Sequence, residues 1–203
     1  MQDNNPEKIE SKSMRIIERE LNQLNGSERE KQVIKRIIHA TADLNLVDKV
    51  KFSPGGINQL RSLIEAGSDI ITDVNMLKAG INSRKLNKFG GQLKCLIAAE
   101  EIRKEAEAAG LTRSIISMRK AVRLPGKKVF AIGNAPTALF ELIRLSEEED
   151  IKIDFIVGTP VGFVGAAESK AKLIASDIPY ISLEGRKGGS AVAASIINSI
   201  LYF

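Results

Sequence analysis

Short apolar segments alternate with helical patterns over the last two thirds of the chain, and this alternation limits the fold more than any other feature. Helices are predicted at 100–109 and 136–146, among others, and strands at 69–73, 93–97, 128–132, 153–157 and 180–183. Repeated strand–helix alternation is typical of a mainly parallel sheet covered by helices. The predicted fold class is therefore α/β, a Rossmann-like arrangement in three layers with a mainly parallel sheet flanked by helices.

The first third of the chain is predicted to be a helical segment that precedes the sheet. Apolar residues recur at helical spacing over residues 9–24. Ser27 and Glu30 have the spacing of a capping box, which opens a second helix. A third helix is predicted at 57–66, after a loop at 52–56.

The size and charge of the chain limit the kinds of partner that it can have. Its 203 residues match one α/β domain with a helical extension, so we expect a single domain spanning 1–203. The formal net charge is only +5, aromatic residues make up 4%, and no long block of Lys and Arg occurs. Base-stacking surfaces and basic arms are thus missing, and no nucleic-acid partner is predicted.

Cysteine usage and terminal hydropathy bear on the compartment. Cys95 is the only cysteine and cannot form a disulfide within the chain, which fits a reducing cytoplasm. It lies in an apolar run and is predicted to be a buried structural thiol. No signal peptide is visible, and the apolar C-terminal run is shorter than the roughly 20 residues of a membrane span. We therefore expect a cytoplasmic protein with no membrane partner.

Two glycine-rich segments, 160–170 and 184–190, carry the strongest functional signal. Each follows a short apolar run that is typical of a strand and leads into an Ala-rich segment that is typical of a helix. Glycines at such a junction let the main chain approach a ligand closely, and a helix start offers free N–H groups to an anion. A ligand with carboxylates or phosphates would suit both segments.

The predicted sheet brings further residues to the same place. Ligands of parallel α/β sheets bind beyond the carboxyl ends of the strands. Thr72–Asp73 and Gly133–Asn134 follow two predicted strands, as the two glycine-rich segments follow two others. Four candidate loops are therefore expected on one rim of the sheet.

Several familiar site patterns are missing or incomplete. Gly162 and Gly165 supply only part of a dinucleotide-binding fingerprint, and 185–190 has P-loop residues in the wrong order. One His and one Cys, far apart, cannot form a usual zinc site. No nucleophile elbow is present. No metal and no cofactor are predicted, and a nucleotide site is disfavoured.

His39 is the only histidine, so any imidazole chemistry must use it. It is predicted on a helix with Arg36 on the same face, where a cation resists its protonation and bound carboxylates favour it. It is either a catalytic group or a satisfied boundary residue. Lys78 and Arg113 either bind carboxylates or solvate the surface, and Glu168 and Lys170 either bind ligand or form a structural bridge.

Taken together, these residues resemble the precorrin-8X methylmutase family of cobalamin biosynthesis, from about Ser13 to near the C-terminus. Met14 and Leu77 are mild departures, since an aromatic residue and Val are common there. The stretches that carry the resemblance are Arg36–Ala40, Thr72–Gly80, Ala131–Leu139, Pro160–Lys170 and Glu184–Ser190.

The resemblance implies an isomerase that moves a methyl group from carbon 11 to carbon 12 of a corrin-type ring. The substrate would be precorrin-8X or cobalt-precorrin-8, and the product hydrogenobyrinic or cobyrinic acid. This intramolecular 1,5 shift needs no methyl donor or redox cofactor. The family's histidine matches His39, as proton donor or acceptor, and the resemblance also implies a homodimer.

The corrin-type tetrapyrrole is a broad polyacid, and its arms would need cationic and main-chain partners. Two other classes stay open: a non-catalytic corrinoid carrier, which would not need His39, and a nucleotide-binding α/β enzyme. The predicted substrate-binding residues are Ser13, Arg36, Thr72, Asp73, Met76, Lys78, Arg113, Asn134, Gly162, Gly165, Glu168, Lys170, Arg186, Lys187 and Gly188.

Overall fold

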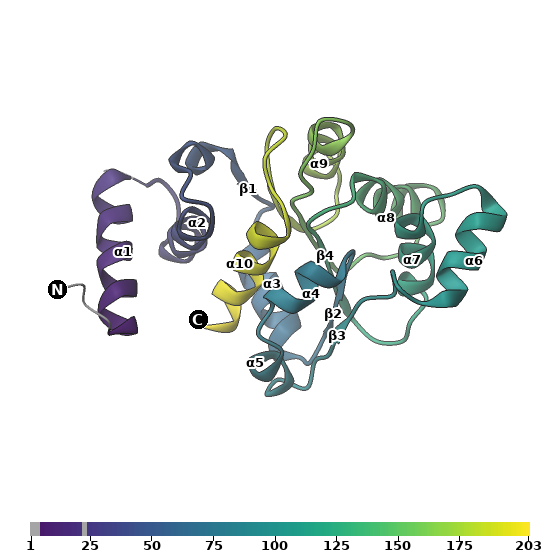
Figure 1. The fold of residues 1–203 in the computed structure, drawn as a ribbon, viewed down its shortest axis with the longest axis horizontal. Helices are drawn as coiled ribbons and strands as arrows, with labels where there is room; N and C mark the ends of the chain where they lie inside the picture. Colours follow the sequence, from purple (N-terminus) through teal and green to yellow (C-terminus); the bar gives the residue numbers. More distant parts are fainter. Residues whose placement is uncertain (1–4, 22–23) are drawn as a thin grey trace.

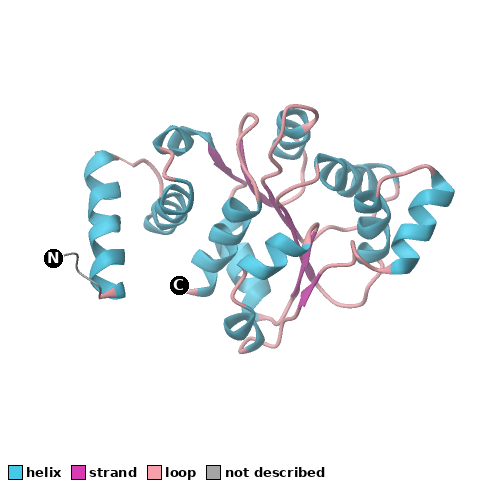
Figure 2. Cartoon of the chain, in the orientation of Figure 1, coloured by secondary structure: helices cyan, strands magenta, loops and turns pink. Residues whose placement is uncertain are grey.

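The computed structural model describes residues 5–21 and 24–203 and is built around one six-stranded sheet (Figures 1 and 2). The strand order is β1-β6-β5-β4-β2-β3, and every neighbouring pair is parallel except β1 and β6. The mainly parallel α/β class is thereby confirmed. The strands are β1 (Val50–Phe52), β2 (Asp69–Thr72), β3 (Leu93–Lys94), β4 (Lys128–Ile132), β5 (Phe155–Gly158) and β6 (Tyr180–Leu183).

Helices cover both faces of the sheet, as the alternation predicts (Figure 1). One core contains residues of α2, α3, α4 and α10, and the other contains residues of α7, α8 and α9. The helices are α1 (Pro6–Glu20), α2 (Glu28–Thr41), α3 (Gly56–Glu65), α4 (Asn75–Gly80), α5 (Ser83–Asn87), α6 (Glu100–Ala109), α7 (Arg113–Val122), α8 (Pro136–Glu148), α9 (Ala166–Ile174) and α10 (Ser190–Leu201), with a 3-10 helix η1 (Leu44–Lys49).

Strand β4 shows why this sheet is buried on both sides. Val129 and Ala131 pack into the α2–α3–α10 core, whereas Phe130 and Ile132 pack into the α7–α8–α9 core. All five β4 residues are buried. Strands of parallel sheets that are covered on both faces read as continuous apolar runs, which is why the sequence shows this strand so clearly.

Helix ends follow local sequence signals. The capping box of α2 is formed, because the Glu30 N–H donates to Ser27 Oγ at 3.3 Å and the Ser27 N–H donates to Glu30 Oε2 at 2.7 Å. Gly110 ends α6 with φ of 63°, in the left-handed region. The first helix ends at Glu20, earlier than its apolar pattern predicts, and residues 22–23 of that pattern lie outside the described residues.

Some elements differ from the prediction. The start of the segment predicted as a loop at 52–56 belongs to β1, which pairs antiparallel with β6 through Lys51 and Ser182. A three-residue strand is too short to show an alternating pattern. Strand β3 covers only two residues of the predicted 93–97, so Cys95 lies beyond it and is half-buried. Among the described residues, no helix has the length and apolarity needed to cross a membrane.

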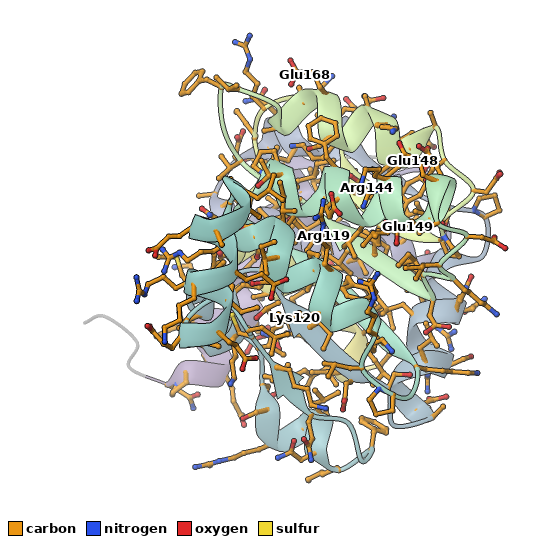
Figure 3. All side chains as sticks on the ribbon, turned by 90° about the vertical axis from the view of Figure 1, so that its right-hand side faces the viewer. Arg119, Lys120, Arg144, Glu148, Glu149 and Glu168 are labelled. Atoms are coloured by element: carbon orange, nitrogen blue, oxygen red, sulfur yellow. The ribbon has the colours of Figure 1, made fainter. Side chains whose placement is uncertain are left out.

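An ion-pair network joins α7 to α8. The carboxylate of Glu141, whose residue is only 6% exposed, accepts hydrogen bonds from Arg119 and Arg144, each at 2.7 Å. Arg144 also pairs with Glu148 at 3.1 Å and Glu149 at 2.9 Å. Figure 3 shows the labelled side chains of Arg119, Arg144 and Glu149 close together on this face.

Candidate active site

The two glycine-rich loops lie side by side at the carboxyl end of the sheet, beside the start of α9 (Figure 1). The Gly162 N–H donates to the Arg186 main-chain oxygen at 3.1 Å, and the Gly189 N–H donates to the Thr159 oxygen at 2.8 Å. A Cβ atom at Gly188 would lie 2.3 Å from the Thr159 oxygen, so only glycine fits at 188. Residues 159–165 and 184–189 thus form one structure, the glycine ridge.

Helices α8, α9 and α10 begin at this edge without a capping side chain. The residues that precede α8, α9 and α10 are Ala135, Gly165 and Gly189, and none of them supplies a side-chain cap. N–H groups in the first turn of a helix have no partner within the helix, and the helix dipole makes that end positive. The edge is therefore suited to a ligand with several anionic groups.

Asp73 holds the adjacent β4–α8 loop from inside the protein. Its carboxylate accepts hydrogen bonds from the N–H groups of Gly133, Asn134 and Ala135, at 3.1, 2.7 and 2.7 Å. Burial raises the pKa of Asp73, and the three donors oppose that rise. Thr72 is also buried and donates to the Lys94 oxygen at 3.4 Å. Thr72 and Asp73 are therefore buried beneath the carboxyl edge of the sheet, whereas Asn134 is exposed at this edge.

Three of the basic residues of the glycine ridge and α9, Lys170, Arg186 and Lys187, have different environments. Lys170 is fully buried, its ammonium group donates to the main-chain oxygen of Lys187, and burial lowers its pKa to about 8. The Lys187 ammonium pairs with Asp43, and this hydrogen bond lowers the pKa of Asp43. Arg186 is exposed, 5.9 Å from the centroid of the Phe163 ring, and has no carboxylate partner within residues 5–21 and 24–203. Arg186 is therefore available to an anionic ligand.

Large apolar side chains are exposed beside these cations. Phe163 is 86% exposed and Val164 is 89% exposed, both in the loop that leads into α9. Met76, in α4 after strand β2, is 76% exposed. A ligand with an apolar body and anionic arms would meet both kinds of group here.

His39 lies in the last turn of α2 and is exposed. It lines a depression of about 500 Å³ between α1, α2 and α10, together with Glu10, Arg36, Ser195, Asn198 and Tyr202. Arg36 pairs there with Glu10 at 2.6 Å. The depression is linked to the glycine ridge, because Asp43, four residues after His39, pairs with Lys187, and α10 contributes to both.

Ser13, Lys78, Arg113 and Glu168 lie on four different helices, and the structure does not bring them together. Ser13 is half-buried and donates to the Ile9 oxygen of its own helix at 3.0 Å. Lys78 lines a separate depression of about 670 Å³ beside α4 and β3. Arg113 is exposed at the start of α7. Glu168 is exposed in the first turn of α9 and does not pair with Lys170, so the predicted structural bridge between them is wrong.

The sequence alone did not show Asp43, Ser195, Asn198 and Tyr202. Asp43 carries no local signal beyond its position four residues after His39. Ser195 and Asn198 lie in the apolar C-terminal helix, and Tyr202 follows its last residue. A cavity of about 710 Å³ lies at the opposite edge, where residues such as Lys127 and Asp154 precede the strands, away from His39 and the glycine ridge. Within the described ranges, no cluster of His, Cys, Asp and Glu could hold a metal ion.

A mainly parallel sheet with a glycine ridge and uncapped helix starts at one edge, together with a histidine-lined depression beside α10, is typical of an α/β enzyme that acts on an anionic ligand. Comparison with known proteins places it more closely. The family model described as "Precorrin-8X methylmutase" matches residues 8–203. The chain therefore belongs to the precorrin-8X methylmutase family.

Relatives and solved structures agree with this placement. The cobalt-precorrin-8 methylmutase of Priestia megaterium is 41% identical over 195 residues, covering 96% of this chain and 87% of the relative. That of Salmonella typhimurium is 44% identical over 171 residues, covering 84% and 80%. The structure of a precorrin-8x methyl mutase from Thermus thermophilus superposes with a TM-score of 0.88 at 33% identity, covering 97% of this chain and 95% of that chain. The similarity in fold thus extends over nearly the whole chain.

Proposed function

We propose that this protein is the isomerase of cobalamin biosynthesis that moves a methyl group from carbon 11 to carbon 12 of its corrin-type substrate. The observation that carries the proposal is the family match over residues 8–203. The migration is intramolecular: the bond from the methyl group to carbon 11 breaks, the bond to carbon 12 forms, and no group enters or leaves. The product is hydrogenobyrinic acid, or cobyrinic acid when the ring carries cobalt.

His39 is proposed as the catalytic proton donor or acceptor. It is the only imidazole of the chain, and it lies exposed in a depression that is also lined by Arg36 and four polar residues of the C-terminal region, Ser195, Asn198, Ser199 and Tyr202. Protonating the conjugated ring system makes it more electron-poor, which eases the migration. General acid catalysis of this kind contributes about 10²- to 10⁴-fold to a rate.

The carboxylate arms of the substrate are proposed to bind along the same edge of the sheet. Cations and the uncapped starts of α9 and α10 supply charge-assisted and main-chain donors. Thr72, Asp73 and Lys170 act from beneath the rim. The residues proposed to contact substrate are Ser13, Arg36, Met76, Lys78, Arg113, Asn134, Gly162, Gly165, Glu168, Arg186, Lys187 and Gly188.

We further propose cobalt-precorrin-8 as the substrate. Six relatives of 32–44% identity are named for the cobalt form, and two of 35–37% identity are named for precorrin-8X. We also propose that residues 1–203 act as one domain, that the protein is a homodimer, and that it works in the cytoplasm. The family resemblance supports the homodimer, and the single cysteine supports a reducing compartment.

The decisive experiment is direct. Purified protein is incubated with precorrin-8X or with cobalt-precorrin-8, and the absorption spectrum is followed as the conjugated ring changes. Conversion of either ring supports the methylmutase, and faster conversion of the cobalt form supports the proposed substrate. Tight binding without conversion would instead identify a corrinoid carrier, and binding of nucleotides but not corrinoids would identify a nucleotide-binding enzyme.

A further inference from the structure

Lys170 is a buried cation whose contact is not with a carboxylate. It lies in the second turn of α9, with 0% of its surface exposed. Its ammonium nitrogen donates to the main-chain oxygen of Lys187, 2.5 Å away in the β6–α10 loop. Within residues 5–21 and 24–203 it has no ion-pair partner, and Glu168 of the same helix is exposed and does not pair with it. Burying a charge without a counter-charge is unfavourable, so the hydrogen bond to the Lys187 oxygen has to offset part of the cost of burying the Lys170 ammonium group.

The hydrogen bond between Lys170 and the Lys187 oxygen lies in the middle of loop 184–189, which also carries Arg186. The Arg186 oxygen accepts from the Gly162 N–H, the Lys187 oxygen accepts from Lys170, and the Gly189 N–H donates to Thr159. Hydrogen bonds therefore hold the main chain of the exposed loop 184–189 at three positions, 186, 187 and 189. The side chain of Arg186 itself makes no ion pair among the described residues, so its direction depends on how its main chain is held.

We infer that Lys170 is a positioning residue, which fixes the main chain of loop 184–189 from inside the protein and so directs Arg186 toward the ligand edge. What Arg186 binds rests on the proposed function, but the fixing of the loop does not. A hydrogen bond made by a charged group contributes enough to shift a local opening equilibrium by about tenfold. Loss of the ammonium group should therefore release the loop without unfolding the sheet.

Trypsin cleaves after arginine and lysine, so its rate of cleavage after Arg186 and Lys187 measures how often loop 184–189 opens. Lys170→Met keeps the length of the side chain and removes its charge and donors. Lys172→Met is the matched control, since Lys172 lies on the same helix but pairs with Glu147 at the surface. When opening is fast, cleavage follows the open population. We expect Lys170→Met to be cut after Arg186 or Lys187 about tenfold faster than wild type, and Lys172→Met to be cut at the wild-type rate, with fragments assigned by mass spectrometry.

The wild-type protein gives a second measurement that does not depend on the variant folding. The pKa of Lys170 is about 8, so its ammonium group loses charge between pH 7 and 9. Wild-type cleavage in the loop should rise over that interval, after correction for the protease with a small peptide substrate, and Lys170→Met should show no such rise. Burial raises the pKa of Tyr180 away from this interval. The elements packed against α9, α9 itself and loop 184–189 carry other titratable and charged groups, but burial alone lowers the pKa of Lys170. These groups are Glu141, Arg144, Glu147, Glu148, Glu168, Lys172, Tyr180, Glu184, Arg186 and Lys187.

A kinetic measurement connects the loop to the ligand. With the corrin substrate, Lys170→Met should raise KM about tenfold and change kcat less, because Arg186 is lost as a binding group while His39 is untouched. Cleavage of Lys170→Met at the wild-type rate together with a flat wild-type pH series would overturn the inference, whatever reaction the protein catalyses. If the loop opens as expected but wild-type protein converts no corrin substrate, the proposed function is wrong and the role of Lys170 in the loop is retained.

Discussion

At the scale of single residues, the candidate site separates groups that face the ligand from groups that support them. Arg186 and His39 are exposed, while Asp73 and Lys170 are buried and bind main-chain atoms. The sequence shows that all four are polar residues, but it does not show which of them are buried. That distinction depends on packing of segments more than 50 residues apart, as in the hydrogen bond between Asp73 and Asn134.

Replacing His39 by alanine should abolish most of the turnover while leaving binding intact. The side chain is exposed and makes no hydrogen bond with another described residue, so its removal leaves no buried group unpaired. We expect kcat to fall by about 10²- to 10⁴-fold, the usual contribution of a general acid or base. Stopped assays of the corrin product would measure this, with product titration and thermal unfolding as controls. Near-normal turnover would remove His39 from the mechanism.

Arg186 and Lys187 are neighbours in sequence but should differ in their contribution to binding. Lys187 is already neutralised by Asp43, whereas Arg186 has no carboxylate partner among the described residues. Arg186→Gln should therefore weaken binding of the polyacid by about tenfold, and Lys187→Gln by less. Titration at low and high salt would test this, since screening weakens exposed charge pairs.

A control for net charge comes from the other edge of the sheet. Lys152 is exposed beside the amino-edge cavity, away from His39 and the glycine ridge. Lys152→Gln removes the same charge as either loop variant and should leave the affinity unchanged. Equal losses in all three variants would indicate a general field effect in place of local contacts.

At the scale of elements, the strands and the glycine ridge differ in how far sequence predicts them. The buried β4, β5 and β6 are clear from their apolar runs, and the loops that follow them are clear from glycine. Strand β1 is not, because its three residues pair with β6 only after the chain has folded back over more than 100 residues. Helix α7 is also absent from the sequence prediction, and its contact with α8 through Glu141 involves charged residues that carry no apolar pattern.

The contact between α7 and α8 should make stability depend on acidity. Burial of Glu141 works against its ionisation, but hydrogen bonds from Arg144 and Arg119 outweigh burial and lower its pKa below the ordinary 4.5. A carboxyl whose pKa is lower in the folded state stabilises the fold above its unfolded pKa and loses that contribution as the pH falls through the folded value. Glu141→Gln should therefore lower the free energy of unfolding by about 2 kcal/mol at pH 7.

This difference between wild type and Glu141→Gln should shrink as the pH falls below 4.5. Urea unfolding at several pH values would measure it. Glu148→Gln is the matched control, because Glu148 lies on the same helix and also pairs with Arg144 but is largely exposed. Its effect should stay below about 1 kcal/mol. A constant difference at all pH values would show that Glu141 acts through packing alone.

At the scale of the whole molecule, the chemistry proposed predicts how the purified protein behaves. An isomerase whose substrate and product differ little in shape tends to bind its product as well. We expect protein incubated with product to keep cobyrinic or hydrogenobyrinic acid through dialysis, visible as bound colour, and to convert substrate without added nucleotide, flavin or metal. His39→Ala should keep the same colour. Failure to retain any corrinoid, or strict dependence on an added cofactor, would contradict the methylmutase.

Sequence motifs predicted the family and the ligand edge better than the shape of the site. Pro160–Lys170 and Glu184–Ser190 are local patterns, and each is recognisable without knowing what it packs against. The depression around His39 is assembled from α1, α2 and α10, which come from opposite ends of the chain. No local sequence pattern predicts that these helices pack together, so Ser195 and Tyr202 could be identified as site residues only from the folded structure.

The two edge strands of the sheet affect how readily the protein aggregates at high concentration. The open backbone of an edge strand is a template on which other chains can add and polymerise. Here the edges are β1, with three residues, and β3, with two, and each carries a lysine, Lys51 and Lys94. Those lysines pair with Glu184 and Asp69 of the neighbouring strand or loop. A foreign strand would find only two or three residues to pair with and a charge among them, so the sheet is closed to growth at both ends.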